Sequence, residues 1–283
     1  MDTVTPAEKW PRISVIIPSY NQGVFIRQTI DSVMAQGYPN LELIVIDGGS
    51  QDGTRAILRE YGSDLAYWIS EPDNGQSHAI NKGLAVATGS LVGWLNSDDL
   101  YLPGFLFQSA SHFAANPGCD VVFGDYVFID SSGIVLKHRR ETPFDFNTYL
   151  WARGCFHANC AGMFQHRVFT EVGGLREDLQ FAMDYEFYLR IGSRGLRVDH
   201  VSECWGAYRL HLGSKTVASN ESQVREMDTV AAMYAPDASS AWLRGPFHSA
   251  KRRLRKLATG CYRPWERIGL WANAHRIEVT PGG

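Results

Sequence analysis

Residues 91–99 read Leu-Val-Gly-Trp-Leu-Asn-Ser-Asp-Asp, an apolar run that ends in two adjacent carboxylates. The first five residues have the composition of a buried strand. Two neighbouring aspartates at the end of such a strand repel each other and lose solvation, which is tolerable mainly where a cation or water reaches them. The stretch therefore predicts a core strand that ends in a divalent-metal site at Asp98 and Asp99.

Three similar units precede this strand. Apolar runs predict strands, and the segments after them have helical spacing, in the order Ile13–Ile17, Val24–Met34, Leu41–Ile46, Thr54–Tyr61, Leu65–Ser70 and Gln76–Ala87. Strands that alternate with helices predict a mostly parallel sheet covered on both faces. Ligands of such sheets bind at the carboxyl ends of the strands, where polar residues follow each run.

The second half of the chain has a different order. A helix is expected over Pro103–Ala115, and the runs Val121–Ile129 and Gly133–Lys137 predict antiparallel strands joined by an Asp-Ser-Ser-Gly turn. A short helix over Phe144–Trp151, a strand over Ala161–Gln165 and a helix over Met183–Ser193 follow. We expect this half to complete the same sheet rather than to form an independent domain.

The composition indicates a globular protein. The 283 residues are 45% hydrophobic and 20% charged, which argues against disorder. No run approaches the roughly 18 apolar residues that span a bilayer, and the start lacks a signal-peptide core, so we expect a cytoplasmic protein. The odd number of cysteines favours reduced thiols. Cys155, His157 and Cys160 suggest zinc, but a fourth ligand is missing, which favours a core strand instead.

The positive charge is concentrated near the end of the chain. Residues 244–263 hold seven basic side chains and no acid, so the net charge of −3 leaves about −10 for the rest. Apolar residues recur there at helical spacing: Phe247, Ala250, Leu254, Leu257 and Ala258. Such a helix either lies on an anionic membrane surface or packs on the domain or in a dimer. Nucleic acid is not expected as a partner, because the body is acidic and has no aromatic recognition motif.

An ordered set of motifs resembles the family 2 glycosyltransferases. It comprises residues 13–21, 46–54, 71–75, 79–83, 95–99, 173–175, 184–186 and 208–211. The resemblance implies a GT-A fold, which is a Rossmann-like α/β fold with a mixed, mostly parallel sheet. It spans residues 11–216, with a nucleotide-sugar-binding half (11–100) and an acceptor half (101–216), and leaves 217–283 as a basic helical tail.

The same resemblance implies inverting transfer of a sugar from a UDP-, GDP- or dTDP-linked donor. The acceptor would be a hydroxyl of a saccharide or of a polyprenyl-diphosphate-linked saccharide, as in bacterial cell-surface polysaccharide synthesis. An enzyme of that kind would work in the cytoplasm, with peripheral contact to the inner face of the membrane through the basic tail.

Donor-binding residues follow from the resemblance. Asp47 would accept hydrogen bonds from the base, although an Asp before Gly-Gly also forms turns. Asp73 and Asn81 would line the nucleotide pocket, although Asn81 equally suits a helix surface. Lys215, in a Gly-containing polar stretch that ends at Thr216, would contact phosphates, although such a stretch also suits a solvated loop. The other expected donor-site residues are Pro18, Ser19, Tyr20, Asn21, Gly49, Gln76, Asn96, Ser97 and Asp98.

The metal motif of the family, Asp-x-Asp, begins here with Asn96. The resemblance makes Asp98 the ligand for Mg²⁺ or Mn²⁺, cations that prefer oxygen. Asn96 still has a carbonyl oxygen but no negative charge. Asp99 is expected as a second ligand, directly or through water, or as a residue that positions the sugar. His211 is a further candidate ligand.

Asp184 is the candidate general base, because the family carries its base in an Asp-Tyr-Asp/Glu string. On a helix from Met183, Asp184 shares the face of the apolar Phe187, Tyr188 and Ile191. Glu186 and Arg190 would then form a solvated ion pair on the opposite face. The alternative for Asp184 is a helix N-cap. His157 is expected on the acceptor side, with a core histidine as its alternative.

Two other functions compete with transfer. A non-catalytic nucleotide-sugar-binding protein would lack the base or the metal carboxylate, and both are present. A nucleotidyltransferase would have a Gly-rich, basic phosphate loop after the first strand, and residues 18–23, Pro-Ser-Tyr-Asn-Gln-Gly, contain no basic residue.

Overall fold

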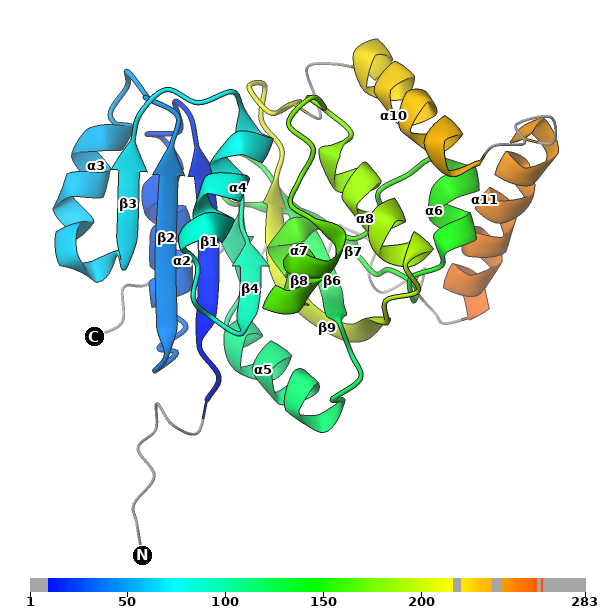
Figure 1. Ribbon diagram of the computed structural model, residues 1–283, viewed down its shortest axis with the longest axis horizontal. Coiled ribbons are helices and arrows are strands. Elements are labelled where there is room, and N and C mark those ends of the chain that lie inside the picture. Colours follow the sequence, from blue (N-terminus) through cyan, green and yellow to red (C-terminus); the bar gives the residue numbers. More distant parts are fainter. Residues whose placement is uncertain (1–9, 216–219, 236–240, 259–260, 262–283) are drawn as a thin grey trace, which may run out of the picture.

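The computed structural model describes residues 10–215, 220–235, 241–258 and 261. Within these residues the chain forms a nine-stranded sheet in the order β3-β2-β1-β4-β8-β6-β9-β5, with β7 paired to β6. Helices lie on both faces of this sheet (Figure 1). The predicted fold class, a mixed α/β sheet flanked by helices, is confirmed.

The four strands of the first half pair in parallel with one another. Its strands are β1 (Ile13–Ser19), β2 (Leu41–Asp47), β3 (Tyr67–Ser70) and β4 (Leu91–Trp94), and its helices are α2 (Ile26–Met34), α3 (Thr54–Tyr61), the one-turn η1 (Gly62–Asp64) and α4 (Gln76–Val86). Ser19 pairs with Asp47, and Asp47 pairs with Ser70. The register therefore aligns the polar ends of three strands at one edge of the sheet.

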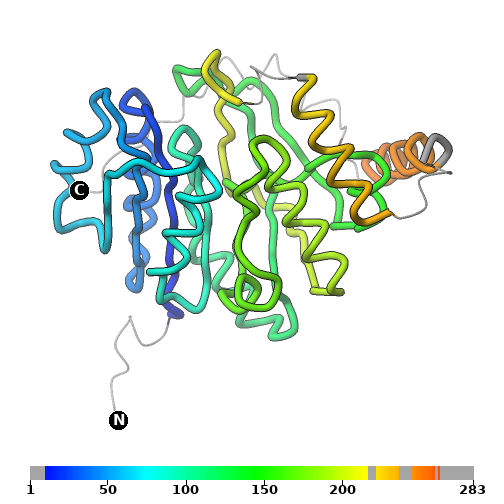
Figure 2. The backbone as a smooth tube through the Cα atoms, turned by 45° about the horizontal axis from the view of Figure 1, so that its top comes forward, coloured from blue at the N-terminus to red at the C-terminus, as the bar shows by residue number. Residues whose placement is uncertain are grey.

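The second half adds mostly antiparallel strands and further helices. In chain order the elements are β5 (Leu100–Tyr101), α5 (Phe105–Ala115), β6 (Val121–Ile129), β7 (Val135–Arg139), α6 (Phe146–Ala152), η2 (Asn159–Ala161), β8 (Gly162–Gln165), α7 (His166–Val172), α8 (Met183–Ser193), β9 (Val198–Arg209), α10 (Asn220–Tyr234) and α11 (Ala241–Ala258). The predicted β6–β7 hairpin is present. Strand β8 pairs antiparallel with β4 and so joins the two halves into one sheet. Figure 2 shows the first half, in blue to cyan, side by side with the second half, in green to orange.

The alternation of side chains along β1 divides the core into two layers. Ile16 packs in one apolar cluster, whereas Ile13, Val15 and Ile17 pack in the other, on the opposite face of the sheet. Gly83 lets α4 approach the sheet closely, since a Cβ at this position would lie 2.4 Å from Ile16 Cγ2. Burial of both faces of the central strands holds their carboxyl ends rigidly in place.

Helix α11, in the basic tail, packs beside α6 at one end of the molecule (Figure 1). Lys251 forms an ion pair with Asp145, and Arg252 and Lys256 form ion pairs with Glu141. Several basic side chains of the tail thus face the domain. Among the described residues, no helix is both long and apolar enough to cross a bilayer.

Candidate active site

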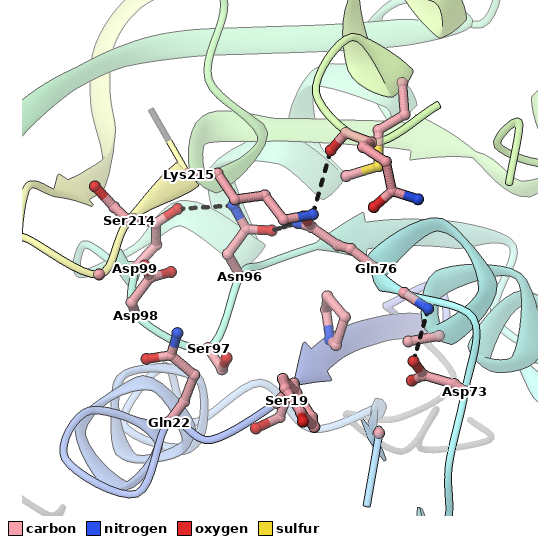
Figure 3. A pocket seen from close by; sticks show the side chains of 18 of the residues that line it. Ser19, Gln22, Asp73, Gln76, Asn96, Ser97, Asp98, Asp99, Ser214 and Lys215 are labelled. Atoms are coloured by element: carbon pink, nitrogen blue, oxygen red, sulfur yellow. Dashed lines mark hydrogen bonds between the residues drawn. The ribbon is translucent and has the colours of Figure 1, made fainter. Parts of the chain in front are cut away.

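An open cavity of about 700 Å³ lies at the carboxyl ends of the parallel strands. Figure 3 shows Ser19 from the end of β1, Asp73 from the loop after β3, and Asn96 and Asp98 from the turn after β4 around it. Most of the predicted site residues line this cavity, namely Pro18, Ser19, Tyr20, Gly49, Asp73, Gln76, Asn96, Ser97, Asp98, Asp99, Asp184 and Lys215. Residues up to 197 positions apart in the sequence therefore share one cavity.

Asp98 and His211 lie in contact at this cavity. His211 Nε2 is 3.0 Å from Asp98 Oδ2, and both side chains are largely buried. Gly213 donates its amide hydrogen to His211 Nδ1, and the His211 ring packs on Phe25 with the ring centroids 4.7 Å apart. The tautomer that fits these contacts carries its proton on Nε2 and donates it to Asp98.

Asp99 points away from Asp98 and into the protein. Its Oδ1 accepts a hydrogen bond from the Arg209 amide at 2.8 Å, and its Oδ2 accepts one from Asn96 at 3.3 Å. Burial, and then the neighbouring charge of Asp98, raise the pKa of Asp99 well above its ordinary value. The two adjacent aspartates are thus not equivalent, because the carboxylate of Asp99 is engaged by the protein.

Asn96 connects the carboxylate turn to the rest of the cavity. Its Oδ1 accepts hydrogen bonds from Gln76 Nε2 at 2.8 Å and from Trp94 Nε1 at 3.0 Å, while its Nδ2 donates to Asp99. Lys215 in turn donates to Gln76 Oε1 at 3.3 Å. An aspartate at position 96 could not donate to Asp99 and would add a third negative charge. The amide therefore suits this turn, and its oxygen is already occupied by two donors.

Two residues of the cavity have features expected of ligand contacts. The buried hydroxyl Oγ of Ser19 has no hydrogen-bond partner among the described residues, although it lies at the end of β1 on the cavity wall. The carboxylate of Asp73 lies over Gly48, where a Cβ would come within 2.8 Å of Asp73 Oδ2. Both leave polar atoms directed at the space that a ligand would fill.

Asp184 lies in the first turn of α8 and lines the cavity. The N-cap residue is Ala182, so the N-cap alternative for Asp184 is wrong. Burial raises the pKa of Asp184, and hydrogen bonds from the Tyr185 amide and the Cys155 thiol oppose this effect only in part. A carboxylate with a raised pKa beside a cavity is a candidate proton acceptor.

The start of α8 is held by a residue of α10. The Glu226 carboxylate accepts hydrogen bonds from the amides of Gln180, Phe181 and Ala182 at 2.9, 2.6 and 2.6 Å. A carboxylate is stabilised at a helix N-terminus by the unpaired amides and the helix dipole. Glu226 thus fixes the segment that carries Asp184.

The predicted solvated pair of Glu186 and Arg190 is wrong. Their side chains form an ion pair at 2.8 Å, but Glu186 is only 3% exposed. The Tyr234 hydroxyl donates to Glu186 at 2.7 Å, since α10 covers this side of α8. Arg190 also donates to the carbonyl oxygens of Val172 and Gly174, so the pair ties three segments together.

Asp47 and Asn21 lie beside the cavity but outside its lining. Asp47 is fully buried and accepts hydrogen bonds from the Ser50 amide, the Ser50 hydroxyl and the Ser70 hydroxyl. Asn21 has a φ of 53° and accepts a hydrogen bond from the Gln51 amide. The structure therefore gives both residues a place in building the loop wall, and the turn-forming alternative for Asp47 describes its contacts.

Asn81 and His157 do not lie on the cavity either. Asn81 donates to the Leu175 carbonyl at 2.8 Å and accepts from the Leu175 amide at 2.8 Å, which fastens α4 to the segment after α7. His157 is 4% exposed and contacts the Tyr149 hydroxyl and the Thr142 carbonyl through its two ring nitrogens. Burial lowers the pKa of His157 to about 3. The core alternative for His157 is the one that the structure supports.

Among the described residues, Cys155, His157 and Cys160 do not form a ligand cluster, which argues against the zinc alternative. The cluster that does form joins His112, Cys119 and Asp199, with the ligand atoms within 4.8 Å of one another. Arg197 binds both carboxylate oxygens of Asp199, at 2.9 and 3.0 Å, and so already supplies the positive charge there.

Arg209 is a residue of the site for which the sequence reasoning assigned no role. It is fully buried, and its side chain donates to the Asp98 carbonyl, the Asp130 and Ser131 carbonyls and Gln28. Its guanidinium lies over the Phe25 ring at 4.9 Å. The available signal was a single arginine between Tyr208 and Leu210, because an arginine buried among such neighbours needs carbonyl or carboxylate partners.

Comparisons with known proteins agree with this geometry. The model of the family described as "Glycosyl transferase family 2" matches residues 14–174, which is more than half of the chain. An uncharacterized glycosyltransferase of Rickettsia bellii is 33% identical over 191 residues, covering 64% of this chain and 27% of that protein. One of Mycobacterium tuberculosis is 33% identical over 182 residues, covering 64% of this chain and 68% of that protein.

The matched regions of the first three curated relatives, all from Rickettsia species, span 27%, 31% and 60% of those proteins. Two solved structures share the fold. Staphylococcus aureus TarS 1-349, in complex with UDP-GlcNAc, has a TM-score of 0.64 at 19% identity, over 87% of this chain and 73% of its own. The mannosyltransferase PcManGT of Pyrobaculum calidifontis, in complex with GDP-Man and Mn²⁺, has a TM-score of 0.57 at 21% identity, over 93% and 85%.

The fold shared with these two structures is the GT-A fold, as the sequence motifs predicted. Together with the family match over residues 14–174, it establishes that this chain belongs to glycosyl transferase family 2.

Proposed function

We propose that this protein transfers a sugar from a nucleotide-diphospho-sugar to an acceptor hydroxyl with inversion at the anomeric carbon. Residues 11–216 form the catalytic unit in this proposal. The observation that carries it is the placement of Asp98 and Asp184 on the walls of one cavity, although they are 86 residues apart in the sequence. One carboxylate suits a cation beside a diphosphate, and the other suits a proton acceptor.

Asp184 acts as the general base in this mechanism. It takes the proton of the acceptor hydroxyl as that oxygen attacks the anomeric carbon and the nucleoside diphosphate leaves, in a single displacement. The raised pKa of Asp184 makes its carboxylate a stronger base than a solvated aspartate. Glu226 and the α8 helix keep the carboxylate in a fixed direction, which lowers the cost of orientation.

The residues present fit a divalent cation at Asp98. Its carboxylate borders the open cavity, and Mg²⁺ or Mn²⁺ is typically held by one or two carboxylates plus substrate phosphates. When bound, such a cation stabilises the negative charge of the leaving diphosphate. The Asp99 carboxylate accepts a hydrogen bond from the Arg209 amide and so stabilises the turn that carries Asp98. His211 would ligate through Nε2 only if the Gly213 amide moved away from Nδ1, because the ring proton would then have to sit there.

The donor would lie across the first half of the sheet. Ser19, Asp73, Gln76 and Lys215 supply hydroxyl, carboxylate, amide and ammonium groups around the cavity, and Lys215 suits a diphosphate. The solved relatives were obtained with UDP-GlcNAc and with GDP-Man, which supports a nucleotide-sugar and leaves UDP-, GDP- and dTDP-linked donors as candidates. The transferred unit is a hexose or an N-acetylhexosamine in this proposal.

We assign the acceptor to the class of saccharides or polyprenyl-diphosphate-linked saccharides of cell-envelope polysaccharide synthesis. An enzyme that uses a polyprenyl-diphosphate-linked acceptor would act at the inner face of the membrane. The non-catalytic alternative and the nucleotidyltransferase alternative are less well supported, since the cavity combines a base with a metal carboxylate and the loop after β1 has no basic residue.

The Asp184→Asn variant tests the base assignment. A panel of UDP-, GDP- and dTDP-sugars is first screened for thermal stabilisation with Mn²⁺. Release of nucleoside diphosphate from the stabilising donor should then fall by about 10²–10⁴-fold in the variant, with an unchanged donor Kd. Asp178→Asn is the matched control, because its side chain is 64% exposed and lies near the start of α8. Near-normal turnover of the Asp184 variant would contradict the proposed base.

A further inference from the structure

In helix α11, charged side chains face the domain and apolar side chains face away from it, which is unusual for a surface helix. The side that faces α6 carries Arg252 and Lys256, whereas large apolar side chains lie on the opposite side. An ordinary surface helix buries its apolar side and exposes its charges. The reversed arrangement of α11 therefore needs an explanation beyond packing on the domain.

The inward side is satisfied by acidic residues of the domain. The side chain of Glu141 is fully buried and pairs with Lys256 at 2.8 Å and with Arg139 at 3.0 Å, besides Arg252. The guanidinium of Arg252 also lies over the Phe156 ring at 3.8 Å. These contacts fix the rotation of α11 about its axis, so they determine which side chains point outward.

The outward side combines apolar and basic residues. Phe247, Leu254 and Leu257 are 64%, 65% and 61% exposed, and their spacing of seven and three residues places them on one side of the helix. Ala250 and Ala258 are exposed on the same side. Arg253 is exposed next to this stripe, whereas Arg255, although exposed, forms an ion pair with Asp145 at 3.5 Å; residues 241–258 contain no acidic residue.

We propose that this outward side of α11, defined by Phe247, Ala250, Leu254, Leu257 and Ala258, binds an anionic lipid surface. Apolar side chains enter the headgroup region while flanking arginines remain with the lipid phosphates, which is how interfacial helices bind. The surface has only one sign of charge, which is complementary to an anionic membrane. This lipid-binding role goes beyond the proposed catalytic activity, because the surface lies on a helix outside the cavity.

Charge also distinguishes the lipid from other occupants. A second copy of the chain would bring Arg253 of one copy near that of the other, which is repulsive. Residues 262–283 of the same chain contain three arginines and two glutamates, so they carry no net negative charge. An anionic lipid surface is the partner that complements both the apolar stripe and Arg253.

Vesicle flotation of the full-length protein tests this proposal. Vesicles of phosphatidylcholine alone are compared with vesicles that contain about 30% phosphatidylglycerol, at about 0.15 M salt. Partitioning should be at least about tenfold stronger on the anionic vesicles. Equal partitioning on both vesicles, or no binding to either, would overturn the proposal.

Variants locate the binding surface. The combined variant Phe247→Ser, Leu254→Ser and Leu257→Ser should lose at least about tenfold in partitioning, and Arg253→Glu about fivefold or more. The matched control is Val224→Ser with Met233→Ser on α10, whose side chains are 53% and 50% exposed. The control should partition like the parent protein. Unchanged binding of the triple variant, or an equal loss in the control, would contradict the assignment to α11.

Two further measurements exclude a folding defect and a dimer. The triple variant should keep its melting temperature and its release of nucleoside diphosphate, because exposed side chains contribute little to stability. Light scattering should show the same mass for parent and triple variant. A dimer that only the parent forms would identify this surface as a self-interface and overturn the lipid proposal. Asp184→Asn should bind vesicles normally, so failure of the catalytic proposal and failure of this one are distinguishable.

Discussion

Two clusters of buried charge in this molecule use similar residues with opposite balance. The active-site cluster (Asp98, Asp99, Arg209 and His211) has two carboxylates and one arginine, whereas the α11 cluster (Glu141, Arg139, Arg252 and Lys256) has one carboxylate and three cations. Burial and Asp98 raise the pKa of Asp99. Burial also favours a higher pKa for Glu141, but Arg252, Lys256 and Arg139 outweigh it and lower the pKa.

This difference separates a ligand site from a structural contact. In the active-site cluster the negative charge exceeds the positive charge at the edge of an open cavity, so an added cation would be stabilised there. In the α11 cluster the carboxylate is fully neutralised by the chain itself and needs no ligand. We therefore expect a cation to bind where net negative charge borders a cavity, rather than wherever charge is buried.

Asp98→Asn should have the largest effect and bears directly on the comparison. If Asp98 holds the cation, release of nucleoside diphosphate should fall by about 10³-fold in the presence of Mn²⁺, since the leaving diphosphate loses several kcal/mol of stabilisation. The melting temperature should change little. Activity is measured with the donor that the screen identifies. A variant that loses stability but keeps activity would place Asp98 in the same structural class as Glu141.

Glu141→Gln should lower stability and leave donor binding unchanged, which is the opposite of the effect expected for Asp98→Asn. Removing this carboxylate leaves three buried or half-buried cations without their partner, which typically costs about 3–5 kcal/mol in the free energy of unfolding. Chemical denaturation measures this loss, and the Kd for the nucleotide-sugar should stay the same at temperatures where the variant is folded. Glu203→Gln, at an exposed acid of β9, is the control. A drop in donor affinity without loss of stability would contradict the purely structural role assigned to Glu141.

The pKa shifts of Asp184 and Glu141 have opposite signs, so both effects should be lost on acidification but in different pH ranges. The raised pKa of Asp184 means that activity falls with decreasing pH at a value above the ordinary aspartate pKa of about 3.9, because the base must be ionised. The lowered pKa of Glu141 means that its stabilisation is fully present above about pH 4.3 and is lost as pH falls through the lowered value. Activity profiles and unfolding at several pH values measure both, and Glu141→Gln should remove only the second effect.

Asn81→Ala should have the smallest effect and adds an uncharged site to the comparison. Its amide makes paired hydrogen bonds with Leu175, so the variant should lose about 1–2 kcal/mol of unfolding free energy. Donor affinity should not change, because Asn81 does not line the cavity. Calorimetry with the nucleotide-sugar measures that affinity. A clear loss of donor affinity at unchanged stability would show that Asn81 belongs to the nucleotide pocket.

Much of the first half of the fold could be predicted from the sequence. The runs that became β1, β2 and β4 are apolar on both faces, so local composition and tertiary environment agree there. Strand β9 was not predicted, because Val198–Arg209 mixes charged, aromatic and small residues and has no regular alternation. Its pairing with β6 depends on contacts with residues about 80 positions earlier, which no local pattern encodes.

The cavity lining was also predicted better than the individual contacts. Strand ends determine which residues reach the cavity, and this follows from the order of strands and helices. Whether a carboxylate points outward or accepts a hydrogen bond from its neighbours depends on partners elsewhere in the chain. Asp47 is engaged by Ser50 and Ser70, and Glu186 is covered by Tyr234 of α10, which the spacing within α8 could not show.

The hydrogen bonds that Glu226 accepts at the start of α8 bear on how much of the chain the proposed active site needs. The family match ends at residue 174 and the recognisable motifs end at residue 211, yet the amides before Asp184 are held from α10, which begins at Asn220. A fragment that stops after the last motif would contain every recognisable signature but would lack Glu226, which holds the amides before Asp184. If Asp184 is the base, residues beyond the proposed catalytic unit of 11–216 therefore contribute to its position.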